Sequence, residues 1–346
     1  MKRLALWMMA ALAAPAFSQD WIPLQDGKSL AGWKAAERPE SWVVEDGAFV
    51  TRGDRSHLFY VGKVGKHDFR NFELSLEVMT APGANSGVYV HTKWQGPGWP
   101  EAGYELQVIN SNPPAEKMNG YIEHKMTGSI YAVRNTWAAP ARDNEWFNYR
   151  IRVVGKTIQT FVDGQLICEY AEPADAFRAA DKAKRRLGSG TFALQAHDPG
   201  SVVKYRNIKV RLLPDDAKPP EGLVPLEDRE LDELVTQASN DNIPLIDFFL
   251  RPKDETLRAE GRRLGVTFAD ELSSDPGPPA VPVVIITDTD QGPNVELLKA
   301  AKAAGAKVIF GTHQDQQFSA GRLKKRLQAI KAAGLGWKDF YVPGKP

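Results

Sequence analysis

The sequence predicts a mainly β fold, a two-sheet sandwich, followed by a small α/β domain. Short runs of alternating apolar and polar residues recur between residues 19 and 213, and Gly, Pro, Asn and Asp residues separate them. Within this region only residues 174–186 show a helical pattern. Beyond a Pro-rich linker at 214–222, helical and strand patterns alternate. Many short strands at regular spacing, without helices between them, are typical of a β-sandwich.

Each expected strand of the sandwich rests on its alternation and on the turns beside it. Residues 72–78 read FELSLEV, which places Phe, Leu and Val side chains on one face and Glu and Ser side chains on the other. The Asp-Gly pair at 163–164 predicts a tight hairpin turn. The expected strands are 42–50, 57–62, 69–79, 86–92, 103–110, 128–133, 146–155, 157–163, 165–170, 190–197 and 201–212.

The domain at 223–346 is expected to alternate helix and strand. Its expected strands are apolar throughout, as burial on both faces requires. The expected helices are 227–239, 254–264, 293–304 and 319–333, and the expected strands are 243–249, 281–287 and 306–310.

The N-terminal residues predict export. Lys2 and Arg3 precede an apolar run that ends near residue 14, and Ala16 and Ser18 are the small residues that a signal peptidase requires. We therefore expect residues 1–18 to be a signal peptide and the mature protein to be periplasmic or secreted. The run is shorter than the about 20 apolar residues of a membrane span, so membrane insertion is not expected.

Composition narrows the class of partner. A net charge of +1 with 25% charged residues gives no general attraction to nucleic acid or to anionic membranes. The single cysteine, Cys168, excludes an internal disulfide. Nine Trp residues favour a carbohydrate partner, because indole faces stack on the C–H surfaces of sugars.

The candidate site lies in two expected strands, 86–92 and 103–110, and in the loop between them, which is rich in Gly, Pro and Trp. Alternation places Val and Leu side chains on the core face of both strands, and an imidazole, a carboxylate, an amide and a phenol on the other face. Such groups bind sugar hydroxyls and move protons. The polar face and the loop contribute Tyr89, His91, Trp94, Trp99, Glu105 and Gln107.

Further candidates come from later segments. In FALQAHD, alternation places Gln195 and His197 on the same polar face. Residues 112–127 form a long loop that is expected to wall the cleft and to bring His124 to the ligand. Tyr131 and Arg134 follow it and are expected to contact the ligand. The remaining histidines of this region, His57 and His67, are expected to face solvent or to be bonded locally.

Residues 20–212 resemble the 3-keto-disaccharide hydrolase domain family. The resemblance is carried by an ordered set of segments: WIPLQDGKSLAGW, WVVEDGAFV, FRNFELSLEV, NSGVYV, GYELQVIN, TGSIY, EWFNYRIRVVG, FVDGQLI and GTFALQAHD followed by VKYRNIKV. It implies a concanavalin A-like jelly-roll β-sandwich whose concave face holds carbohydrate. It also implies cleavage of glycosides already oxidised at the 3-hydroxyl of the sugar.

The implied activity suggests roles for the candidates. A ketone at C3 acidifies the C2 proton, so a base can remove it and the enolate can expel the substituent at C1, after which water adds. Glu105 is the expected base, His91 its partner and His197 the third catalytic residue. The expected substrate contacts are Tyr89, Gln107, Trp94, Trp99, Tyr131, Arg134, Gln195 and His124.

One alternative stays open at this point: a non-catalytic, lectin-like carbohydrate-binding module would need the same hydroxyl contacts without proton transfer. No HxH or HxxxH spacing occurs, so we expect no catalytic metal or other cofactor, while a structural calcium ion is left open.

The C-terminal domain faintly resembles a degenerate metal hydrolase of the polymerase-and-histidinol-phosphatase type. Phe249 and Arg251 stand where that superfamily has a metal-binding pair, and only Asp247 and His313 match its ligands. Residues 223–346 are also too few for a barrel of roughly 200 residues or more. We expect a non-catalytic domain that docks, dimerises, or recruits a sugar 3-dehydrogenase or another pathway protein.

Overall fold

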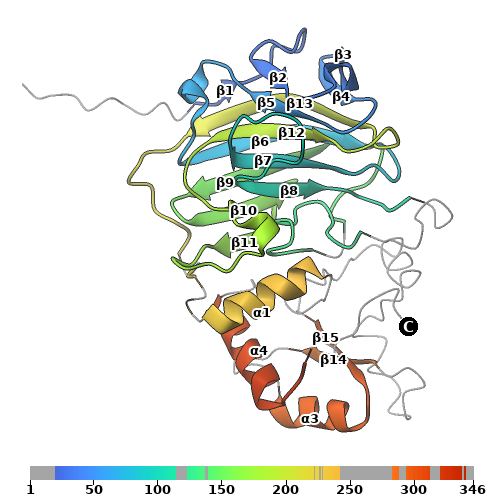
Figure 1. Cartoon of the computed structure of the whole chain (residues 1–346), viewed down its shortest axis with the longest axis vertical. Helices are drawn as coiled ribbons and strands as arrows, with labels where there is room; N and C mark the ends of the chain where they lie inside the picture. The colour runs from blue at the N-terminus through green and yellow to red at the C-terminus, as the bar shows by residue number, and fades with distance from the viewer. Residues whose placement is uncertain are drawn as a thin grey trace, which may run out of the picture.

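The computed structural model describes residues 20–113, 123–136, 139–221, 223–225, 227, 229–241, 283–287, 294–311, 320–336 and 339. The predicted signal peptide lies outside these residues. Figure 1 shows two parts: a β-sandwich, and a smaller group of helices with two strands beyond it. No helix in the described ranges is both long and apolar enough to cross a membrane.

The larger sheet of the sandwich has eight antiparallel strands. Their order is β11-β10-β9-β6-β13-β4-β3, and β1 pairs with β13. The strands are β1 (Ile22–Pro23), β3 (Trp42–Glu45), β4 (Ala48–Thr51), β6 (Phe72–Thr80), β9 (Phe147–Val154), β10 (Thr157–Val162), β11 (Gln165–Ala171) and β13 (Val203–Leu212).

The smaller sheet has five antiparallel strands, and one of its faces carries the candidate site. Their order is β2-β5-β12-β7-β8. The other face packs on the eight-stranded sheet, so that Val88, Leu106 and Leu194 join one continuous apolar core. This arrangement confirms the predicted mainly β, two-sheet sandwich. The strands are β2 (Trp33–Ala35), β5 (Ser56–Tyr60), β7 (Ser86–Thr92), β8 (Tyr104–Val108) and β12 (Thr191–Ala196).

Four local predictions can be compared with the structure. The Asp163-Gly164 turn is confirmed, with φ of 48° and 83° between β10 and β11. The expected strand 42–50 is divided into β3 and β4, because Asp46 and Gly47 also adopt positive φ and form a turn. The expected strand 128–133 is wrong, since Ile130 makes only isolated bridges. Where a short helical piece was expected near 174–186, the structure has one turn of 3-10 helix, η4 (Ala180–Lys182).

The described part of the C-terminal domain matches the predicted alternation. β14 (Val283–Thr287) and β15 (Lys307–Gly311) form a parallel pair, as a helical crossover between them requires. The helices are α1 (Arg229–Asn240), α3 (Val295–Ala303) and α4 (Ala320–Ala332). Phe249, Arg251, Asp247 and His313, on which the metal-hydrolase resemblance depended, lie outside the described residues.

Helix α1 contacts the sandwich directly (Figure 1). Asn135 Nδ2 donates to the Ser239 carbonyl at 2.8 Å, and the Phe177 backbone N–H donates to Asp232 Oδ2 at 2.6 Å. Asp232 and Ser239 are fully buried. The first helix of the C-terminal domain is therefore hydrogen-bonded to two loops of the sandwich, the loop that contains Asn135 and the loop that contains Phe177.

Candidate active site

The outer face of the five-stranded sheet carries rows of polar side chains. Tyr89 on β7 pairs with Glu105 on β8, and Gln195 on β12 pairs with His57 on β5. Their chain neighbours, such as Val88 and Leu106, point into the core. Because side chains alternate along a strand, these four polar residues share the face that points away from the core.

A cleft of about 660 Å³ opens on this face. Seven of the predicted site residues line it: Tyr89, Trp99, Glu105, Gln107, Tyr131, Gln195 and His197. Other lining residues come from loops and from the end of α1: Asn85, Asn112, Pro113, Glu123, Lys182, Arg185, Asp198 and Asn240. The cleft thus combines aromatic, amide, cationic and acidic side chains, a mixture that suits a hydroxyl-rich ligand.

Glu105 lies in the wall of this cleft and is 7% exposed. Gln195 Nε2 donates to its Oε1 at 2.8 Å, and Arg185 Nη2 lies 3.6 Å from its Oε2. Burial raises the pKa of the Glu105 carboxyl above its ordinary value of 4.5, although the Arg185 guanidinium acts in the opposite direction. A carboxylate of this kind is a stronger base than an exposed one.

Gly87 provides the space that the Glu105 side chain occupies. A Cβ built on Gly87 would lie 2.8 Å from Glu105 Oε1 and 3.0 Å from its Cγ. These separations are shorter than van der Waals contact, so any larger residue would displace the carboxylate. Packing against the Glu105 side chain therefore explains why the residue at position 87, within NSGVYV, is glycine.

Two amides of the cleft hold acceptors that are buried and unpaired. Gln195 Oε1 and Gln107 Oε1 have no hydrogen-bond partner among the residues that the structure describes. Their amide nitrogens are used, since Gln107 Nε2 donates to Asn85 Oδ1 at 3.2 Å and Gln195 Nε2 donates to Glu105. Buried acceptors without partners cost stability, and a ligand hydroxyl can satisfy them.

His197 forms a pair with Asp198 at the edge of the cleft. The His197 Nδ1 lies 2.7 Å from Asp198 Oδ2, and the Ser201 hydroxyl and Gly200 N–H also donate to Asp198. The hydrogen bond from His197 lowers the pKa of Asp198 to about 2, although partial burial acts against it. The carboxylate stays ionised and orients the imidazole, which leaves Nε2 for a ligand.

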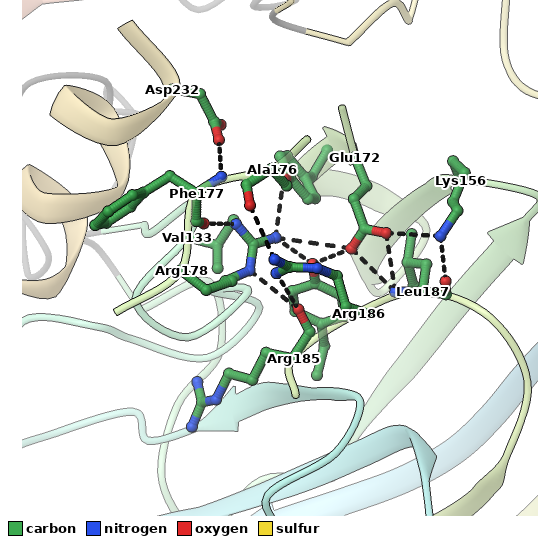
Figure 2. Close-up of polar contacts among 12 residues, drawn as sticks. Val133, Lys156, Glu172, Ala176, Phe177, Arg178, Arg185, Arg186, Leu187 and Asp232 are labelled. Carbon is green, nitrogen blue, oxygen red and sulfur yellow. Dashed lines mark hydrogen bonds and ion pairs between the residues drawn. The ribbon is translucent and has the colours of Figure 1, made fainter. Parts of the chain in front are cut away.

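Arg185 reaches the cleft from a loop that is held by a buried ion network (Figure 2). Glu172 lies at its centre: Lys156 Nζ donates to it at 2.8 Å, the Leu187 N–H donates at 2.9 Å and Arg178 Nη2 lies 3.7 Å away. The Glu172 and Arg178 side chains are almost completely buried. In Figure 2 the Arg185 side chain extends away from this network. The network therefore fixes both ends of the segment that carries Arg185.

His91 does not lie beside Glu105, so its predicted position is wrong. Its φ of 52° interrupts the strand alternation, and the ring packs against Phe72 at a centroid distance of 5.6 Å. Gly188 N–H donates to Nδ1 at 3.1 Å, and Nε2 lies 3.0 Å from the Arg70 carbonyl. Burial lowers the pKa of His91 to about 4. Both nitrogens have backbone partners in the segments that precede β6 and β12, which is typical of a structural histidine.

Three predicted substrate contacts also lie outside the cleft. Trp94 lines a separate depression of about 580 Å³, where the Lys34 ammonium lies 4.3 Å from its ring centroid. Arg134 donates to the Val133 carbonyl at 2.6 Å, and its guanidinium lies 4.8 Å from the ring centroid of Tyr170 on β11. His124 is buried in the loop and is not among the lining residues. The separate positions follow from loop paths that alternation does not describe.

Arg185, Lys182 and Asp198 were not predicted as site residues. Arg185 and Lys182 belong to the basic run KAKRR at 182–186, which lies within the segment that is expected to be helical and ends four residues before β12. Four positive charges in five residues are a signal that could have been weighed. Within the described ranges, no three His, Cys, Asp or Glu side chains gather as metal ligands would.

Comparison with known proteins identifies the family of the chain. A sequence model of the 3-keto-alpha-glucoside-1,2-lyase-like domain matches residues 20–211. A 3-keto-disaccharide hydrolase from Bacteroides thetaiotaomicron is 26% identical over 242 residues, which cover 59% of this chain and 82% of the relative.

Two crystal structures from Parabacteroides distasonis, provisionally named glycosyl hydrolases, were also found. They share 22% and 25% identity with this chain, with TM-scores of 0.47 and 0.44. Both cover 56% of this chain, and the matches span 94% and 100% of those proteins. Since the family match spans more than half of the 346 residues, the chain belongs to the 3-keto-alpha-glucoside-1,2-lyase-like domain family and is an enzyme of the glycoside-cleaving type.

Proposed function

We propose that the protein is exported and cleaves 3-keto glycosides, in particular 3-keto-disaccharides, by elimination followed by addition of water. The names of the family and of the Bacteroides thetaiotaomicron relative support this substrate class. The signal-peptide pattern of residues 1–18 supports export. The observation that carries the proposal is Glu105, a buried carboxylate of raised pKa in the wall of the cleft, between an amide and a guanidinium.

In the first step, Glu105 removes the proton from C2 of the sugar. The ketone at C3 makes this proton acidic, because the electron pair left on C2 is delocalised onto the C3 oxygen. The raised pKa of Glu105 brings its basicity closer to what this transfer needs. Arg185, 3.6 Å from Glu105 Oε2, is assigned to stabilise the negative enolate oxygen.

In the second step, the enolate expels the substituent at C1. The C3 carbonyl forms again, a double bond forms between C1 and C2, and the C1–O bond breaks. His197, oriented by Asp198, is assigned to protonate the leaving oxygen. Water then adds its oxygen to C1 and a proton to C2, so that the sum of the steps is hydrolysis of the glycoside.

The test uses two substrates that differ only at C3. Purified protein is incubated with 3-keto-trehalose and with trehalose, and released sugar is measured by chromatography. We expect release from the ketone alone, because only the ketone acidifies the C2 proton. Equal cleavage of both sugars would contradict the elimination mechanism. Binding of both sugars without cleavage would show a carbohydrate-binding module instead.

A further inference from the structure

His57 is the most anomalous polar side chain near the cleft. It is fully buried, and neither ring nitrogen has a hydrogen-bond partner among the residues that the structure describes. Burial lowers the pKa of His57 from 6.5 to about 3, so the ring stays neutral. A neutral imidazole offers one donor and one acceptor, and leaving both unpaired in the protein interior is unfavourable.

His57 lies on the sheet in line with other buried polar groups that lack hydrogen-bond partners. His57 on β5 pairs with Gln195 on β12, whose Oε1 is buried and unpaired, as is Gln107 Oε1 on β8. Gln195 in turn donates to Glu105 at 2.8 Å. The unpaired polar groups thus extend from the catalytic carboxylate across the face of the sheet to β5.

The Trp99 indole separates His57 from the cleft. Its ring centroid lies 5.4 Å from that of His57 and 5.3 Å from that of His197, and the Trp99 residue is 45% exposed. Trp99 lines the cleft, whereas His57 is absent from its lining. The loop that carries Trp99 contains Gly96, Pro97 and Gly98, and a Cβ on either glycine would meet nothing within 4 Å. The loop is therefore unpacked at these two glycines, and nearly half of the Trp99 surface is exposed to solvent.

We propose that the cleft has a second compartment, floored by His57 and closed by the Trp99 indole, that binds the leaving sugar of a disaccharide substrate. The proposal rests on the proposed function and adds to it. The contacts run in the order of the substrate: Glu105 at the reacting ring, His197 at the leaving oxygen, then Trp99 and His57. When the indole moves aside, one sugar hydroxyl can donate to the acceptor nitrogen of His57, and a second hydroxyl can accept from its N–H. The indole and the Tyr89 ring supply the apolar faces on which a sugar stacks.

The first experiment tests the cover without any substrate. Histidines of the full chain are modified with diethyl pyrocarbonate and followed residue by residue by mass spectrometry, in wild type and in Trp99→Ala. We expect diethyl pyrocarbonate to modify His57 at least about tenfold faster in Trp99→Ala than in wild type, because removal of the indole opens the imidazole to solvent. His91 is the matched control, since it is equally buried but hydrogen-bonded on both nitrogens. An unchanged rate at His57 would show that Trp99 does not close the compartment.

The second experiment tests the ligand. For His57→Leu, the ratio of kcat/KM for 3-keto-trehalose to kcat/KM for methyl 3-keto-glucoside is measured, because the methyl glycoside has no second sugar. We expect this ratio to fall about tenfold, while the unfolding temperature rises because two unpaired polar atoms are removed. His57→Gln, which keeps a donor and an acceptor, is expected to restore part of the ratio. A constant ratio in His57→Leu would overturn the assignment, whether or not both rates fall.

The two experiments separate the proposals. If wild type cleaves neither ketone, the proposed function fails, and the labelling result alone decides whether a Trp99-covered compartment exists. If wild type cleaves both ketones and the ratio does not change in His57→Leu, the proposed function stands and the second compartment is rejected.

Discussion

Glu105 and Glu172 are both buried carboxylates, and their surroundings differ in one respect that decides their use. The Leu187 backbone N–H donates to both oxygens of Glu172, at 3.2 and 2.9 Å, within a network that encloses the carboxylate. Glu105 accepts from Gln195 on one side and faces Arg185 at 3.6 Å, but it also lines a cleft. A buried acid that its partners enclose holds structure, whereas one that is open to a cleft on one side is available to a substrate.

The strongest test of this comparison is Glu105→Gln. We expect kcat for the 3-keto-disaccharide to fall on the order of 1000-fold, because the amide cannot accept the C2 proton. The unfolding temperature at pH 7 should stay the same or rise, since burial makes the charged form of Glu105 unfavourable. Activity assays and thermal unfolding of the same preparation check both. A variant that keeps its turnover would remove Glu105 from the mechanism.

Glu172→Gln should show the opposite pattern. Removing the charge leaves the buried Arg178 guanidinium without its carboxylate, so we expect a loss of about 3 kcal/mol in the free energy of unfolding. Urea unfolding at pH 7 measures it, with the exposed Glu145→Gln as the matched control. A loss below about 1 kcal/mol, the value typical of exposed pairs, would show that the network does not hold the Arg185 loop.

Gly87→Ala tests the position of the Glu105 carboxylate while its chemical identity stays the same. The added methyl group would lie 2.8 Å from Glu105 Oε1, so the carboxylate must move. We expect kcat to fall about tenfold, with a small loss of stability, because a displacement of this size misaligns the proton transfer. Gly188→Ala is the control, since its Cβ would meet nothing within 4 Å. Equal kinetics in Gly87→Ala and wild type would show that the position of Glu105 is not critical.

The smallest expected effect is on pH dependence. Glu105 acts as a carboxylate with a raised pKa, so kcat/KM should fall as pH drops, with a midpoint above 4.5. Arg185→Gln should move this midpoint upward, because the guanidinium is what lowers the pKa of Glu105. Because the pKa is raised, ionised Glu105 destabilises the fold at pH values above its folded-state pKa. This destabilisation disappears as the pH falls below the pKa of Glu105 in the unfolded chain.

Thermal unfolding between pH 7 and pH 4 checks that sign. The stability advantage of Glu105→Gln over wild type should shrink as the pH is lowered. An activity profile that is flat down to pH 4 would contradict the raised pKa, and an advantage that grows toward low pH would contradict its direction.

Strand alternation predicted much of the site and failed where the backbone left the β conformation. Tyr89, Glu105, Gln107 and Gln195 lie on the face that their spacing indicates, because β7, β8 and β12 are regular at these positions. His91 has positive φ, which nothing in its side chain requires, and it turns to the core.

Residues that reach the cleft from loops could not be placed by alternation. Arg185 arrives in a segment whose path is set by Glu172 and Arg178, and such long-range contacts have no local periodicity. His57, expected to be exposed or locally bonded, does share the outer face with Gln195. It packs against Tyr89 and against Trp99, which lies 42 residues further along the chain, and spacing within β5 carries no information about these contacts.

The contacts of α1 with the sandwich have a practical meaning for anyone who trims this protein. The family match ends at residue 211, well before Asp232 and Ser239. A fragment cut at that boundary would expose the Phe177 amide and the Asn135 side chain, and it would take Asn240 from the rim of the cleft. The part of the chain that forms the cleft therefore extends beyond residue 211, where the family match ends.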